Sequence, residues 1–181
     1  MNCSQNRRDI SPITRIEFFT IDGFANLTAM PIRFATLQDM PDLLAGGERM
    51  HALTRFRAHP YERARLEKAF TDLITQGQGK YAFLVAANSH GQVVGVLLGV
   101  MEQHIFSPGW CASVMHYDVL PEARGGGYAV RLLKAFEQWA KNRQAIEINL
   151  GINSGGDFER VGRFASRMGY RKIGENYVLS L

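Results

Sequence analysis

The spacing of apolar and polar residues divides the chain after residue 29 into short strands and amphipathic helices. Apolar runs at 81–87 and 92–101 bracket the turn-forming residues 88–91, so they predict two antiparallel strands joined as a hairpin. Apolar residues at helical spacing predict helices within 61–75 and 127–142. Helices on either side of a mostly antiparallel sheet make a mixed α/β domain the expected fold class.

Shorter segments complete the expected topology. Thr36 as N-cap and Asp39 in the first turn predict a helix that runs toward Leu44, and the pair Gly46-Gly47 predicts its interruption. The remaining elements predicted by the pattern are a helical stretch at 48–57, strands at 32–35, 112–120 and 145–152, a helix at 157–168 that Gly169 ends, and a pair of terminal strands within 170–181.

Residues 1–29 differ from the rest because they carry no sustained helix or strand pattern. Their apolar piece, 16–27, is broken by Glu17, Asp22 and Gly23, which is not typical of a secretory signal peptide. We therefore expect 1–29 to be an N-terminal extension that is dispensable for activity, and 30–181 to form the functional domain.

Composition narrows the class of protein. The 181 residues are 46% hydrophobic and 21% charged, which suits one globular domain, and no apolar run approaches the roughly 20 residues that span a bilayer. The net charge of +4 comes from scattered arginines, and it suits a small polyanion better than nucleic acid, because no basic helix or aromatic stacking platform accompanies it. With only two cysteines, a reducing cytoplasmic location is expected. The absence of a membrane-spanning run and of a basic helix means that we expect no membrane or nucleic-acid partner.

The stretch Arg124-Gly-Gly-Gly127 lies between the strand expected at 112–120 and the helix expected at 127–142. The first N–H groups of a helix lack intrahelical acceptors and, with the helix dipole, attract anions. Glycines would let a phosphate approach the backbone, and the Arg124 guanidinium suits phosphate oxygens. The stretch therefore predicts a pyrophosphate site, although a triple glycine in isolation could equally be a flexible turn.

The longer stretch Val119-Leu-Pro-Glu-Ala-Arg-Gly-Gly-Gly-Tyr-Ala129 resembles the acetyl-CoA signature of the GNAT N-acetyltransferase superfamily. Arg124, Gly127 and Ala129 occupy its three defining positions, and residues 167–170 resemble the family's Gly-Phe signature. The resemblance covers the chain after residue 29. It implies acetyl-CoA as co-substrate, no metal, and a sheet of about six to seven strands in which the fourth and fifth splay apart to admit CoA.

Further site residues follow from this resemblance alone. The peptide groups of Val119 and Leu120 would pair with pantetheine, and Asn153 is the candidate for an asparagine that the family often places there, since Phe158 occupies the usual position. The resemblance assigns the pyrophosphate to the amides of Gly125, Gly126, Gly127, Tyr128 and Ala129.

The chain departs from the family where a tyrosine often protonates the departing thiolate. Ala165 occupies that position, which leaves Tyr177 as a candidate acid. A tyrosine in a terminal strand also serves simply as a packing residue. The source of this proton is therefore open.

Strand alternation suggests the base that would deprotonate an amine. His116 and Asp118 fall on one face of the strand at 112–120, opposite Met115, Tyr117 and Val119, so they could act as a base or a proton relay. A structural His-Asp pair or a solvent-facing histidine is the alternative. Glu102 and His104 are second candidates, although a solvated loop explains them more simply.

Two functions remain in competition at this point. The first is an acetyl-CoA-dependent N-acetyltransferase that transfers the acetyl group directly to an amine of a small molecule or a protein. The second is a GNAT-fold module that binds CoA with little or no turnover and acts as a sensor or interaction partner. The sequence identifies neither the acceptor nor the oligomeric state, a homodimer included.

Overall fold

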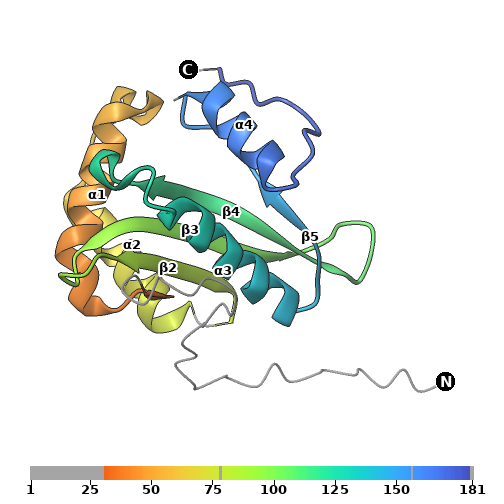
Figure 1. The fold of residues 1–181 in the computed structure, drawn as a ribbon, viewed down its shortest axis with the longest axis horizontal. Coiled ribbons are helices and arrows are strands. Elements are labelled where there is room, and N and C mark those ends of the chain that lie inside the picture. The colour runs from red at the N-terminus through yellow and green to blue at the C-terminus, as the bar shows by residue number, and fades with distance from the viewer. Residues whose placement is uncertain (1–30, 78, 156, 180–181) are drawn as a thin grey trace.

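The computed structural model describes residues 31–77, 79–155 and 157–179, which form one twisted sheet with helices on both faces (Figure 1). The predicted extension, 1–29, lies outside these residues. The strands lie in the order β1-β2-β3-β4-β5, antiparallel except for the parallel pair β4 and β5. Their bounds are β1 Ile32–Phe34, β2 Tyr81–Ala87, β3 Val93–Gln103, β4 Trp110–Val119 and β5 Ala145–Leu150.

Four α-helices of the described chain cover the two faces of this sheet. Helices α1 (Met40–Leu53) and α2 (Arg63–Gln76) pack on one face, where Phe70 contacts the cluster around Phe83. Helices α3 (Tyr128–Asn142) and α4 (Phe158–Arg167) lie on the other face, and α3 buries Phe136 and Trp139 there. The mixed α/β class, the hairpin β2–β3 and the β4–α3–β5 unit are thereby confirmed.

The prediction of six to seven strands was wrong, because the sheet formed by the described residues has five. The terminal pair expected within 170–181 is missing from its described part, 170–179. Ile173, Val178 and Leu179 are exposed there, and three apolar residues in succession at 177–179 cannot alternate between two faces. Gly174 further disfavours an extended ladder.

The predicted interruption at Gly46-Gly47 was also wrong, since α1 continues through both glycines to Leu53. A Cβ at Gly47 would collide with the side chain of Leu66, so this glycine lets α2 approach α1 closely. Tertiary packing outweighs the roughly 1 kcal/mol by which each glycine disfavours a helix. Thr54 then starts a separate 3₁₀ turn at Arg55–Ala58.

Candidate active site

The two parallel strands diverge at the centre of the sheet. β4 and β5 pair from Trp110 opposite Ala145 to Val114 opposite Leu150, and no pairing follows. Figure 1 shows β5 leading away from β4 toward α4. The last five residues of β4 therefore have an edge that no other described segment pairs with. This is the splay that the family resemblance implied.

A β-bulge marks the point of divergence. Leu98 on β3 pairs with His116 and Gly99 pairs with Val114, so Met115 is an extra residue without a partner. Beyond the bulge, Tyr117 and Val119 pack toward α3, as alternation predicted. Met115 does not join them and is 54% exposed, because the bulge breaks the period of two at this residue.

The peptide groups at the end of β4 differ in what they can bind. Leu120 N–H donates to Val94 O at 2.9 Å, and Leu120 O accepts from Ala123 N at 2.9 Å, so both of its peptide groups are occupied. Gly95 and Val119 then form a non-hydrogen-bonded pair, which directs the peptide groups of Val119 away from β3. Of the two residues assigned to pantetheine, Val119 keeps its N–H available and Leu120 does not.

The glycine loop presents a row of amides at the start of α3. Gly125 and Gly127 have φ values of 90° and 80°, a left-handed conformation that favours glycine, and Gly127 is the N-cap. Gly126 N–H donates to Ala123 O at 3.3 Å. Within the described ranges, no acceptor is found for the amides of Gly125, Gly127, Tyr128, Ala129 and Val130. Apart from Gly126, the loop offers the donors that a diphosphate needs.

Arg124 is turned back against the strand. Its Nε donates to Val119 O at 3.1 Å, and its Nη2 lies 3.7 Å from Asp118 Oδ1. The side chain of Arg124 is 43% exposed, so it lies beside the loop and also holds the end of β4 in place. Arg124 thus has a structural function that its motif position did not reveal.

His116 and Asp118 share the face of β4 that α1 covers, yet they do not form a hydrogen-bonded pair in the described structure. Asp118 forms an ion pair with Arg49 of α1 instead. His116 is half-buried and has no hydrogen bond to any described residue. Burial lowers its pKa, Arg49 lowers it further, and Asp118 opposes the shift. A lowered pKa favours the neutral imidazole, which is the form that can accept a proton.

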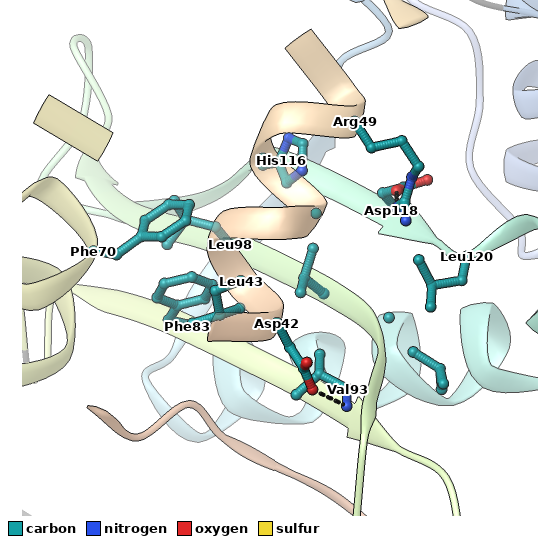
Figure 2. A pocket seen from close by; sticks show the side chains of 15 residues that line it. Asp42, Leu43, Arg49, Phe70, Phe83, Val93, Leu98, His116, Asp118 and Leu120 are labelled. Atoms are coloured by element: carbon teal, nitrogen blue, oxygen red, sulfur yellow. Dashed lines mark hydrogen bonds and ion pairs between the residues drawn. The ribbon is translucent and has the colours of Figure 1, made fainter. Parts of the chain in front are cut away.

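A cavity of about 60 Å³ lies beside His116, between α1, α2, β3 and β4. Figure 2 shows Phe70 and Phe83 on one side of it and the Arg49–Asp118 pair on the other. Arg49 could not be recognised as a site residue from the sequence, because it is brought to β4 only when α1 packs on the sheet. No local motif marks such a residue.

The remaining candidates lie elsewhere. Tyr177 is 89% exposed, belongs to no strand, and donates a hydrogen bond to Glu175 at 2.9 Å. The carbonyl of Asn153 accepts from Arg55 Nε at 2.6 Å, which holds the loop after β5 against the 3₁₀ turn at Arg55–Ala58. Glu102 is exposed at the end of β3, and His104 Nδ1 accepts from Phe106 N in the following turn. Neither Glu102 nor His104 is among the residues that form the wall of the cavity.

Tyr117 is a further residue that sequence reasoning missed. Its hydroxyl donates to the carbonyl of Ala129, which joins β4 to the first turn of α3. Burial raises its pKa far above the ordinary value, so the hydroxyl remains protonated and keeps this bond. The tyrosine therefore fixes the glycine loop relative to the unpaired edge of β4.

The model of the acetyltransferase (GNAT) family matches residues 49–170. The chain belongs to the GNAT family. The match includes the bulge, the unpaired edge of β4, the glycine loop and the whole of α4. In the described part of this GNAT protein, no helix is long and apolar enough to cross a membrane, and no three His, Cys, Asp or Glu side chains are grouped to hold a metal ion.

Solved structures confirm the fold. A transcriptional regulator from Bacillus halodurans is 21% identical with a TM-score of 0.69, covering 84% of this chain and 99% of its own. An aminoglycoside antibiotic 6'-N-acetyltransferase from Acinetobacter baumannii is 21% identical with a TM-score of 0.65, covering 84% and 97%. A Trypanosoma brucei acetyltransferase is 18% identical with a TM-score of 0.65, covering 84% and 99%. No curated protein matches the sequence.

Proposed function

We propose that this GNAT protein is an acetyl-CoA-dependent N-acetyltransferase that transfers the acetyl group directly to an amine of a small molecule or a protein. One observation carries the proposal. Among the described residues, free amides at the start of α3, the unpaired edge of β4 and the unpartnered imidazole of His116 follow one another along a single strand and its exit loop.

These groups divide the binding of acetyl-CoA between them. The amides of Gly125 and residues 127–130 bind the diphosphate, as helix N-termini bind anions. The N–H of Val119 pairs with a pantetheine amide, which lies along β4 in the place that a neighbouring strand would take. The thioester then lies toward the bulge at Met115, where β4 and β5 begin to diverge.

The reaction transfers an acyl group between two nucleophiles. The amine nitrogen attacks the thioester carbonyl carbon, a C–N bond forms, and the C–S bond breaks to release the CoA thiolate. The nitrogen loses one proton, which His116 accepts directly or through a water. Ala165 offers no hydroxyl on α4, so the thiolate takes its proton from water. Holding the amine and thioester together supplies much of the rate acceleration.

The acceptor class rests on related proteins and on the chemistry of the base. Among the similar structures, the Acinetobacter baumannii protein is named for N-acetylation of an aminoglycoside antibiotic, which supports an amine acceptor here too. A neutral histidine suits amines, because their ammonium form must lose a proton before it attacks.

A second candidate function is a CoA-binding module with little or no turnover, and Ala165 is the observation that favours it. Calorimetry with CoA, together with thiol release from acetyl-CoA over a panel of primary amines, separates the two. Sustained thiol release with a matching N-acetylated product in mass spectrometry supports the enzyme. Tight CoA binding without release on any amine would instead identify the module, and absence of CoA binding would contradict both.

A further inference from the structure

Gly46 is unexplained by the packing of the fold. Glycine in the middle of a helix is disfavoured by about 1 kcal/mol relative to alanine. Gly47 has a structural reason, because a Cβ there would collide with Leu66. At Gly46, no heavy atom lies within 4 Å of the position that a Cβ would take, and φ is not in the left-handed region. Alanine would therefore fit the backbone and its surroundings, yet the helix carries glycine.

The space above Gly46 belongs to the cavity beside His116, since Gly46 is one of the residues that line it. No heavy atom would obstruct a side chain at this position. Gly46 thus borders a volume of about 60 Å³ without placing a side chain beside it.

The walls of the cavity are mostly apolar, and its charged side chains already have partners. Asp42 Oδ2 accepts from Val93 N at 2.9 Å, and Arg49 pairs with Asp118. His116 keeps a free imidazole among the described residues (Figure 2). The apolar walls are formed by Leu43, Phe70, Phe83, Val96 and Leu98.

We propose that this cavity binds a short aliphatic group of the acceptor, adjacent to the reacting amine, and that Gly46 determines its size. The inference rests on the proposed function and adds the class of acceptor: an amine with two to four aliphatic carbons beside it. The volume is less than half of the roughly 150 Å³ that accommodates benzene in an engineered protein cavity. An aromatic ring is therefore too large for it.

Three variants test this proposal. Gly46→Ala and Gly46→Val reduce the cavity, whereas Gly162→Ala replaces a glycine in α4 that also has nothing within 4 Å of its Cβ position and does not line the cavity. Both alanine variants should melt at or above the temperature of the wild type, because alanine favours the helix. Valine also has a higher helix propensity than glycine, so Gly46→Val should keep the fold as well.

The readout is a KM series over methylamine, propylamine, isobutylamine and benzylamine at saturating acetyl-CoA. For the wild type, each buried methylene from methylamine up to isobutylamine should lower KM about fourfold. The ring of benzylamine does not fit, so its KM should not fall below that of methylamine. Gly46→Val should remove this gain, raising KM for isobutylamine by about tenfold or more, while methylamine and acetyl-CoA change less than about twofold. Gly162→Ala should match the wild type. An unchanged isobutylamine KM in Gly46→Val would overturn the proposal.

A second readout does not depend on turnover. An apolar cavity binds xenon, so the ¹²⁹Xe NMR shift should report binding to the wild type and to Gly162→Ala but not to Gly46→Val. Equal xenon binding in all three, or none in the wild type, would overturn the inference. If xenon binds as expected but no amine releases thiol from acetyl-CoA, the apolar cavity bordered by Gly46 is correct and the proposed enzymatic function is wrong.

Discussion

The guanidinium of Arg49, on α1, forms an ion pair with the carboxylate of Asp118, near the end of β4. The same carboxylate lies 3.7 Å from the guanidinium of Arg124, the first residue of the glycine loop. One acidic side chain thus joins the helix that borders the cavity to the loop that would bind the diphosphate. We interpret Asp118 as a positioning residue rather than as a base.

Replacing Asp118 by asparagine should destabilise the protein. The side chain is 12% exposed, and the change leaves two guanidinium groups without their counter-charge. We expect the free energy of unfolding to fall by about 1–3 kcal/mol in urea denaturation. Asp72→Asn is the control, since its pair with Lys68 is well exposed and should contribute less than about 0.5 kcal/mol. Equal losses in the two variants would contradict this role.

The rate should depend on the protonation of His116. Burial holds its pKa below the ordinary value of about 6.5, and only the neutral imidazole accepts a proton. We therefore expect kcat/KM to rise with pH and level off, with an acid-side midpoint below about 6.5. Asp118 raises this pKa, so Asp118→Asn should move the midpoint to still lower pH.

Substitution of each histidine by asparagine tests which of the two is the general base. His116→Asn should lower kcat by about 10²–10⁴ and abolish the acid-side dependence. His104→Asn changes a residue in the turn after β3 and should leave both kcat and the acid-side pH dependence unchanged. If the acid-side midpoint persists in His116→Asn, another group is the base.

His116 should also affect stability. Because its pKa is lowered in the folded protein, the unfolded chain binds the proton more readily. The stability from this group is full above pH about 6.5 and is lost as the pH falls through the folded-state pKa. Urea unfolding of the wild type and His116→Asn at several pH values should show that loss only in the wild type.

CoA affinity should depend on the left-handed glycine at the N-cap of α3. Gly127→Asp places a carboxylate beside amides that would bind the diphosphate, and it should weaken CoA binding by about 100-fold in calorimetry. Gly91→Asp is matched to it, since φ is 81° there and nothing lies within 4 Å of its Cβ position. The control should retain CoA affinity, and pantetheine should bind both variants equally. Equal CoA affinity in both variants would contradict the diphosphate site.

Ala165 offers a test of how the thiolate is protonated. Tyrosine at this position would supply the hydroxyl that α4 lacks, so Ala165→Tyr should raise kcat by about tenfold at neutral pH. Ala165→Phe adds the same ring without the hydroxyl and should give no increase. An equal kcat in the two variants would show that protonation of the thiolate does not limit the rate.

Much of this architecture could be predicted from local sequence. The hairpin β2–β3, helix α3 and the glycine loop follow from turn residues, apolar period and helix-start chemistry, all of which act within a few residues. The left-handed φ values of Gly125 and Gly127 are also a local property of the sequence, since only glycine adopts them readily. The motif at 119–129 was also sufficient to indicate the family.

Tertiary packing decided the rest. Helix α1 continues through Gly46 and Gly47, and Leu66 of α2 packs against Gly47. The bulge at Met115 is defined only by pairing with β3. The partner of Asp118 is Arg49, 69 positions earlier in the chain, rather than its neighbour His116. Local pattern constrains the backbone of each element, but an ion pair or a cavity forms only where distant elements meet, and that depends on how they pack.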